Sequence, residues 1–219
     1  HLAPPPVDIA GNFSALTHFG VSSSRLQYAP LWLGKITSLQ CLDLAASSVT
    51  DFASSITESL TRLVGLGLEY NDWLEIPENH SLWSLPALQS LSLYGSKCTL
   101  PRNVSVVPSW RVLGVGKVTS YPLWFDQLTS LEYLNVDQSV MPPSLHFAKK
   151  LIHLGVDKVT ASEDCMTFAN LTMLTDVRFR FSDLFNPSLV RPECYPHVCS
   201  VFIGGSNRSA LAFEEMKRF

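Results

Sequence analysis

The sequence predicts a curved solenoid of stacked coils, with a parallel β-sheet on the concave face and an irregular or 3₁₀ wall on the convex face. Three observations support this fold class: an apolar pattern that recurs about nine times, a small polar residue after most copies, and proline-containing segments between them. The stretch LVGLGLEYNDW at 63–73 shows the pattern best. Its leucines are spaced L-x-x-L-x-L, Asn71 follows, and Trp73 stands at the last apolar position.

Nine copies of the pattern align along the chain. Their first apolar residues lie 20 to 25 residues apart and are Leu16, Leu39, Leu63, Leu88, Trp110, Leu131, Leu151, Leu174 and Val198. A period of about 20–29 residues, with one strand per repeat, is typical of this kind of solenoid. Alternate strand residues point into the coil and out of it. One repeat cannot bury its own apolar face, so stacked neighbours complete the core.

A small hydrogen-bonding residue occupies the ninth position, counted from the first apolar residue, in seven of the nine copies. This ladder position holds Ser24, Ser47, Asn71, Ser96, Val118, Ser139, Val159, Ser182 and Ser206. Such a side chain can turn inward and bond backbone groups that the bend of the coil leaves unpaired. Valine cannot make these bonds, so we expect the turns at Val118 and Val159 to be locally different.

The segments between copies predict the convex wall. The stretches at 30–33 and 122–125 both read P-L-W-[LF] and precede the next strand in the same way. Proline lacks an N–H group and suits irregular or 3₁₀ structure outside a sheet. Trp32 and Trp124 lie in these segments. They could form a convex contact site, but packing against the neighbouring coil is the interpretation we prefer.

The solenoid is expected over 14–206, and its exposed ends need covers. Residues 1–13, with three consecutive prolines, predict an extended N-terminal cap, and residues 207–219 predict a helix-compatible C-terminal cap. The chain has five cysteines, an odd number that leaves at least one without an internal partner. We expect a disulfide near the C-terminal cap between Cys194 and either Cys165 or Cys199.

The repeat unit, its spacing and the walls together resemble the leucine-rich-repeat family over nearly the whole chain. The wall pattern P-x-x-[LF]-x-x-[LI]-T-S-L is similar to the typical repeats of extracellular receptors and intracellular scaffolds. The resemblance implies an α/β-type leucine-rich-repeat solenoid that recognises a partner. Serine mostly replaces asparagine in the ladder, and the L-T-G-x-I-P signature of plant receptors is absent, so their function is not implied.

Glycosylation sequons predict a secreted protein or an extracellular domain. The motif N-x-[ST] occurs at Asn12, Asn79, Asn103, Asn170 and Asn207. The eight asparagines and the Ser and Thr content would give about 1.4 such motifs by chance. No apolar run is long enough to cross a membrane, and the net charge of −3 does not favour nucleic acid. An intracellular leucine-rich-repeat scaffold is the alternative.

We expect no catalysis, cofactor or bound metal. The stretch GVGK at 114–117 lacks the spacing and the following Ser or Thr of a phosphate-binding loop. No H-E-x-x-H or G-x-S-x-G motif occurs. Cys194, His197 and Cys199 could ligate a metal, but no fourth ligand is evident, so a disulfide is the better interpretation.

The outward strand residues predict a protein or peptide partner on the concave face. Glycine occupies the fifth position in four of nine copies, which predicts a low central lane. Aromatic and charged side chains flank it, and Tyr and Arg often dominate the energetics of interfaces. The predicted partner-binding residues are Glu69, Tyr70, Tyr94, Lys117, Tyr133, Asp137, His153, Asp157, Arg178 and Arg180. A merely solvated sheet face is the alternative.

Overall fold

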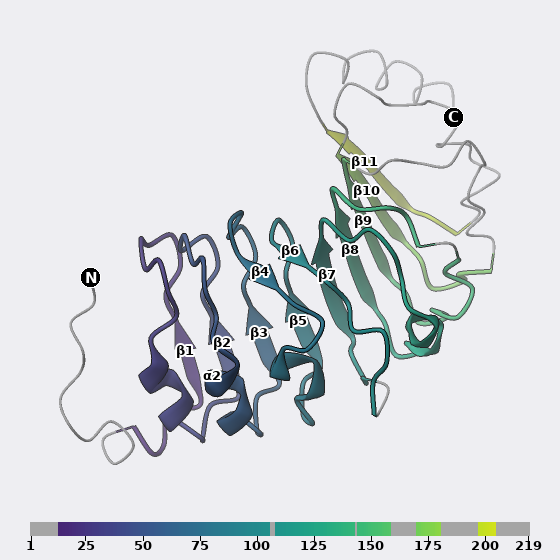
Figure 1. Cartoon of the computed structure of the whole chain (residues 1–219). Helices are drawn as coiled ribbons and strands as arrows, with labels where there is room; N and C mark the ends of the chain where they lie inside the picture. Colours follow the sequence, from purple (N-terminus) through teal and green to yellow (C-terminus); the bar gives the residue numbers. More distant parts are fainter. Residues whose placement is uncertain (1–12, 106–107, 143, 159–169, 181–196, 205–219) are drawn as a thin grey trace.

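Nine parallel strands form one curved sheet. The computed structural model describes residues 13–105, 108–142, 144–158, 170–180 and 197–204. In spatial order, the strands are β1 (His18–Gly20), β2 (Cys41–Asp43), β3 (Gly65–Gly67), β5 (Ser90–Ser92), β7 (Val112–Gly116), β8 (Tyr133–Asp137), β9 (His153–Asp157), β10 (Asp176–Arg180) and β11 (Ser200–Gly204). The row of strands runs level from β1 to β5 and then climbs towards β11 (Figure 1). The predicted solenoid fold is confirmed.

Each strand begins at the third position of a predicted repeat, and neighbouring strands pair without any shift. His18 pairs with Cys41, Cys41 with Gly65, and the same rule holds across the sheet to Asp176 and Ser200. The third, fifth and seventh positions therefore form continuous columns on the concave face. The structure confirms these columns as the sequence pattern predicted them.

The apolar residues between these columns form one continuous core. Leu63 and Leu68 are fully buried and Leu66 is 2% exposed. Trp73 departs from the prediction, because 80% of it is exposed and the adjacent Leu74 is fully buried in its place. The expected final apolar position is therefore shifted by one residue in this coil.

Asn71 joins its own coil to the preceding one. Its Oδ1 accepts the N–H groups of Ser47 at 3.1 Å and Val49 at 2.9 Å. Its Nδ2 donates to the carbonyl oxygens of Leu44 at 3.0 Å and Leu68 at 2.8 Å. Because Asn71 is completely buried, these bonds replace the water that the turn would otherwise need.

The valine at the ladder position alters the turn before it. Ser139 Oγ accepts the N–H of Val118 at 2.8 Å. The Val118 side chain has no oxygen, so it cannot accept an N–H group of the preceding coil. There the N–H of Ser96 bonds the Leu93 carbonyl of its own coil at 2.9 Å. The local difference expected at Val118 is confirmed, and Val159 lies outside the described residues.

A left-handed residue follows the strand in seven successive coils, a feature that the sequence pattern did not reveal. The eighth position has φ between 46° and 81° and holds Ser23, Ala46, Tyr70, Gly95, Lys117, Gln138 and Lys158. Only one of the seven is glycine, although other residues adopt this conformation at a cost of roughly 1–2 kcal/mol. The eighth position is thus the corner of the coil rather than another outward strand column.

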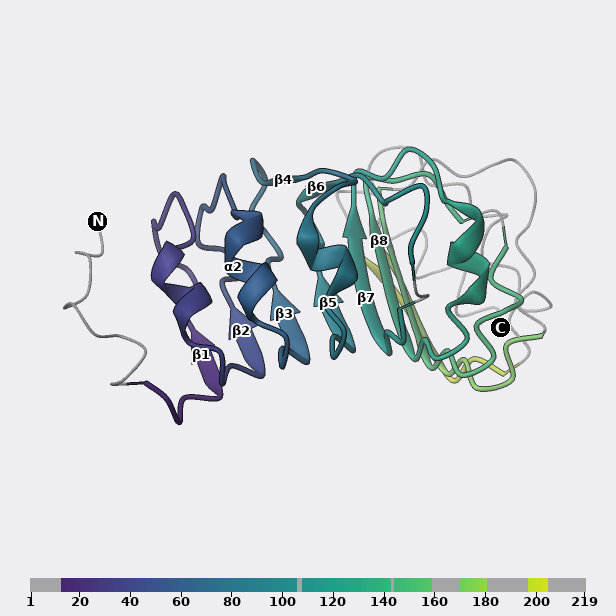
Figure 2. The same ribbon diagram turned by 60° about the horizontal axis from the view of Figure 1, so that its bottom comes forward.

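The convex wall contains short helical turns and one small second sheet. The turns are the 3₁₀ helices η1 (Leu31–Lys35), η2 (Ser81–Ser84) and η3 (Leu123–Gln127), with one α-helix, α2 (Ser54–Ser59). They lie in front of the strands in Figure 2. The second sheet pairs β4 (Glu75–Ile76) with β6 (Lys97–Cys98) in parallel. The predicted wall with little regular helix is confirmed.

Tryptophans of the wall pack inward rather than forming a contact site. Trp124 is 6% exposed and its indole N–H donates to the Pro101 carbonyl of the preceding coil at 2.8 Å. Its ring lies edge-on to Trp110, with ring centroids 6.0 Å apart. Trp32 is partly buried and contacts Phe19 edge-on at 5.5 Å. The preferred wall-core interpretation is confirmed for Trp124.

Several sequence predictions fall on residues that the structure does not describe. Both predicted caps do so, apart from Phe13 at the end of the first. The disulfide candidates Cys165 and Cys194 are likewise outside the described residues, while Cys199 has a free thiol. The glycosylation candidates Asn12 and Asn207 belong to the same group.

Gly116 gives the first testable prediction. A Cβ at this position would collide with the carbonyl oxygen of Ser96 and lie 3.0 Å from the Gly95 nitrogen. Because these are backbone atoms, they cannot rotate away. We expect Gly116→Ala to lower the free energy of unfolding by about 1–3 kcal/mol, measured by urea denaturation.

Gly20→Ala is the matched control, because a Cβ there meets its nearest atoms at 3.7 and 3.8 Å, in ordinary contact. Equal stability of the two variants would contradict the close approach at Gly116.

Candidate functional site

The fifth column of the concave sheet alternates strictly between glycine and a polar residue. From β1 to β10 it contains Gly20, Asp43, Gly67, Ser92, Gly114, Asn135, Gly155 and Arg178. Neighbouring strands lie about 4.8 Å apart, so a polar side chain can lean sideways only where the next residue has none. In this column each glycine therefore provides space for the polar side chain of a neighbouring strand.

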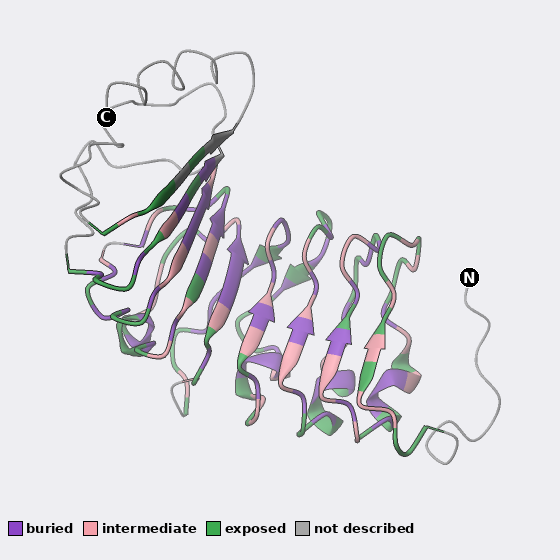
Figure 3. Cartoon of the chain, turned by 180° about the vertical axis from the view of Figure 1, so that it is seen from behind, coloured by how far each residue is buried: buried purple, intermediate pink, exposed green. Residues whose placement is uncertain are grey.

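Polar side chains cover three of these glycines. The space for a Cβ on Gly155 is taken by the Asn135 amide, and the corresponding space on Gly67 lies 2.9 Å from Asp43 Oδ1. Gly114 is covered in the same way by Ser92, whose Oγ is 3.1 Å from the Cβ position. The open glycine lane expected from the sequence is therefore largely filled. In Figure 3 the short strands β3 and β5 combine buried and partly exposed residues, whereas β7 is buried along most of its length.

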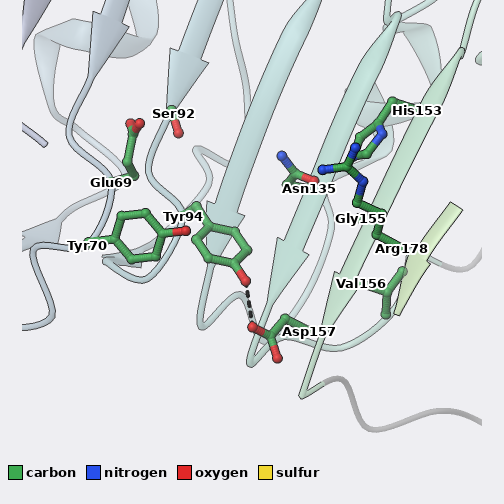
Figure 4. A pocket seen from close by; sticks show the side chains of 10 residues that line it. All are labelled: Glu69, Tyr70, Ser92, Tyr94, Asn135, His153, Gly155, Val156, Asp157 and Arg178. Atoms are coloured by element: carbon green, nitrogen blue, oxygen red, sulfur yellow. Dashed lines mark hydrogen bonds between the residues drawn. The ribbon is translucent and has the colours of Figure 1, made fainter. Parts of the chain in front are cut away.

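One hollow of about 220 Å³ lies on the concave face. Coils on both sides of β7 line it, and no residue of β7 itself is among the lining residues. The lining residues of the hollow are Glu69, Tyr70, Ser92, Tyr94, Asn135, His153, Gly155, Val156, Asp157 and Arg178, drawn in Figure 4.

Six of the ten predicted partner-binding residues line this one hollow. They are Glu69, Tyr70, Tyr94, His153, Asp157 and Arg178. They come from four different coils, and the shared strand register brings them together. Ser92 and Asn135 were not among the predicted partner-binding residues, although the alternation in the fifth column identifies both.

The other four predicted partner-binding residues are not among the lining residues of the hollow. Tyr133 is 41% exposed and stacks on the His153 ring with centroids 5.7 Å apart. Lys117 occupies a left-handed corner, and its ammonium donates to the Asp72 carbonyl at 3.0 Å. The backbone of Arg180 ends β10, and its side chain is outside the described part of the structure.

Asp137 corrects the sequence prediction. It was expected on the exposed rim, but only 3% of it is exposed. It pairs with Asp157 in the register of β8 and β9, so two carboxylates are neighbours in the seventh column. Burial, and then the charge of Asp157, raise the pKa of Asp137 above its usual range. Its side chain accepts a hydrogen bond from Gln138 Nε2 at 3.3 Å.

The side chain of Tyr94 reaches across the concave face of the sheet to another coil. The Tyr94 hydroxyl, from the coil of β5, donates to Asp157 Oδ2 of β9 at 2.5 Å (Figure 4). The bond passes over the coils of β7 and β8, which is possible because β7 has Gly116 in this column. Burial and the bond to Asp157 raise the pKa of Tyr94 above its usual range, so the phenol stays protonated and remains a donor.

We call Glu69, Tyr70, Tyr94 and Asp157 the acidic end of the hollow. The rings of Tyr70 and Tyr94 meet edge-on with centroids 5.4 Å apart. Among the described residues, neither Glu69 nor Asp157 forms an ion pair. Arg180 of β10 is the strand partner of Asp157, and its side chain lies outside the described part of the structure.

At the opposite end, Arg178 and His153 share one carboxylate partner. Asp176 Oδ1 lies 3.1 Å from His153 Nδ1 and 3.2 Å from Arg178 Nε. Burial lowers the pKa of His153, and Asp176 opposes this shift. The guanidinium of Arg178 therefore shares one carboxylate with a largely neutral imidazole.

The described residues offer no site for a metal ion, because no three His, Cys, Asp or Glu side chains gather closely enough among them. Within the same part of the chain, no helix combines the length and the apolar character needed to span a bilayer. These findings concern only the described ranges.

A second hollow of about 500 Å³ lies on the wall side, beside η2. Two predicted glycosylation residues, Asn79 and Asn103, are among its lining residues. Both are exposed, as is Asn170, and none of the three lies in a strand.

Comparison with known proteins identifies the architecture. A leucine-rich-repeat protein of Leptospira interrogans, LIC12759, superposes with a TM-score of 0.58 at 17% identity, covering 89% of this chain and 56% of that one. The chain has the leucine-rich-repeat fold. No protein-family model matches it, and no curated protein is significantly similar in sequence.

Two similar leucine-rich-repeat structures were solved with partners. The TLR13–ssRNA13 complex has a TM-score of 0.54 at 17% identity and covers 90% of this chain. The PEPR1–AtPEP1 structure has a TM-score of 0.50 at 19% identity and covers 81%. This chain spans only 34% and 30% of those proteins, respectively.

The buried Asp137 predicts a pH-dependent stability. Since its pKa is raised on folding, the folded state prefers the protonated carboxyl, and stability falls as pH rises above the ordinary value of 3.8. We expect Asp137→Asn to raise the melting temperature at pH 7, and the gain to disappear below pH 3.8. Thermal melts across this range test the prediction.

Asp72→Asn, on an exposed corner, is the control and should change little. A lower melting temperature of Asp137→Asn at pH 7 would show that its charge stabilises the fold.

Proposed function

We propose that this leucine-rich-repeat solenoid is a non-catalytic recognition module that binds a protein or peptide on its concave face. The convergence of side chains from five coils around one hollow carries the proposal. A shape of this kind suits a partner loop or an extended peptide. Tyr and Arg are present in the lining, and these residues frequently dominate binding energies.

A protein partner is favoured over a nucleic acid by the charges of the hollow. The TLR13 complex contains RNA, so the fold itself does not decide this question. Here the lining includes the carboxylates of Glu69 and Asp157 beside one arginine, Arg178, and the chain has a net charge of −3. Nucleic-acid binding depends largely on cations that neutralise phosphates.

Secretion or an extracellular location is part of the proposal. The five sequons support it, and the three within the described residues leave the concave sheet bare. Glycans there would decorate the wall and the edges without obstructing the hollow. The intracellular scaffold is the alternative.

The binding proposal is tested with Tyr70→Ala/Tyr94→Ala/Arg178→Ala. Each substitution removes a lining side chain from a different coil, and we expect the triple variant to lose about 100-fold in affinity. Immobilised wild type and variant are compared by capture from extracellular fluid, followed by quantitative mass spectrometry and titration of the captured protein.

Leu31→Ala/Leu123→Ala is the matched control, because both leucines are strongly exposed on the convex wall. Partners that the control retains and the triple variant loses would support the concave site. Equal capture by all three proteins would refute it.

The location is tested by expressing the chain behind a secretory signal in mammalian cells. We expect N-glycans on Asn79, Asn103 and Asn170, because all three are exposed. Glycopeptide mass spectrometry measures their occupancy. Retention of the chain in the cell without glycans would favour the scaffold alternative.

A further inference from the structure

His80 joins the convex walls of two successive coils through hydrogen bonds from both ring nitrogens. Its Nε2 lies 2.6 Å from the carbonyl oxygen of Phe52, in the preceding coil. Its Nδ1 accepts the N–H of Leu82 at 3.0 Å and so caps the first turn of η2. His80 is only 6% exposed, and its ring stacks on that of Phe52 with centroids 5.9 Å apart. Burial therefore leaves little room for water to replace either bond.

The two partners fix the protonation state of the His80 ring. A backbone N–H can only donate a hydrogen bond, and a carbonyl oxygen can only accept one. Nδ1 therefore carries no hydrogen, because the N–H of Leu82 points at it, and Nε2 carries the hydrogen that Phe52 accepts. An imidazolium has a hydrogen on both nitrogens. Protonation of His80 would thus break the cap of η2 and place two N–H groups opposite each other.

The charges around His80 act against the effect of its burial. Asp51 and Glu58, from the preceding coil, raise the pKa of His80, as does its bond to the Phe52 carbonyl. Burial is the largest effect, and it lowers the pKa below the ordinary value of 6.5. On the turn that carries His80, Glu78 is paired with Arg102 at 3.6 Å. The folded chain therefore keeps this ring neutral at pH 7, although two carboxylates favour its charged form.

The short helix that follows His80 depends on the cap. Two of the four residues of η2, Leu82 and Trp83, are buried in the wall. The N–H of Trp83 reaches the His80 carbonyl only at 3.2 Å, so the turn itself is weakly bonded. A second link to the preceding coil runs from Ser81 Oγ to the Ser54 carbonyl at 2.8 Å. A hydroxyl does not titrate near neutral pH, so this link remains and the expected change is local.

We propose that His80 is an acid-sensitive switch in the convex wall, in which a proton at Nδ1 releases the first turn of η2 from its cap. The uncapped chain accepts this proton at the ordinary value of histidine, whereas the capped state resists it. The cap therefore contributes fully above pH 6.5 and is lost as the pH falls below that value. The switch does not depend on a partner of the concave face, and it would act wherever the protein meets a mildly acidic medium.

Hydrogen exchange followed by mass spectrometry tests the switch in the full chain. Exchange of the backbone amides of residues 81–85 is measured at about pH 7.5 and about pH 5, and is corrected for the intrinsic effect of pH. We expect the corrected exchange of wild type to be about 10-fold faster at the lower pH. In His80→Asn the amide oxygen can still cap Leu82 and does not titrate, so the corrected rate should change less than about 2-fold.

His146→Asn is the matched control, because His146 is exposed and belongs to another coil. It should respond to pH as wild type does. Burial also lowers the pKa of His153, but that residue is present in every protein compared. The difference between wild type and His80→Asn therefore isolates position 80.

An equal pH response of wild type and His80→Asn, or no response of wild type, would overturn the proposal. If His80→Asn exchanges fast at every pH, ¹⁵N NMR of the wild-type imidazole decides. The neutral form with hydrogen on Nε2, and a titration midpoint below 6.5 that coincides with the rise in exchange, would support the switch. Hydrogen on Nδ1 of the neutral ring, or a midpoint at or above 6.5, would refute it.

Discussion

The hydrogen bonding of neighbouring parallel strands without any shift is the interaction on which the rest of this structure depends. His18, Cys41 and Gly65 are partners across three coils, and the same rule continues to Ser200. One coil cannot bury its leucines alone, so this stacking makes the core continuous. It also converts positions that are some 23 residues apart in sequence into neighbours on one surface.

The concave surface follows from this register together with the choice of side chains. In the fifth column a polar residue leans over each of Gly67, Gly114 and Gly155, so glycine here provides room for a neighbour. Strand β7 has glycine in two adjacent columns, and residues of the coils on either side of it line the hollow. Curvature then brings Tyr94 and Asp157 together across three strand intervals.

The turns that close the coils depend on a few buried polar atoms. The Asn71 side chain makes five hydrogen bonds, and serines at the same position make fewer. Position 118 holds valine, and there the N–H of Ser96 in the preceding coil bonds the Leu93 carbonyl of its own coil instead. The solenoid therefore tolerates variation at the ladder position, because each turn can be satisfied from either its own coil or the next.

The sequence by itself determined the repeat register, the columns, the inward leucines and the irregular wall. These features follow from period and polarity, which are local properties of the chain. It also identified six of the residues that line the hollow, because outward columns can be written down once the register is known.

Only the tertiary structure decided which of those side chains meet. The burial of Asp137, the exposure of Trp73 and the left-handed corner at Lys117 depend on packing between coils and on backbone conformation. The bond from Tyr94 to Asp157 depends on the curvature of the whole sheet. Such properties are sums over many contacts between coils, and no single repeat contains the information that sets them.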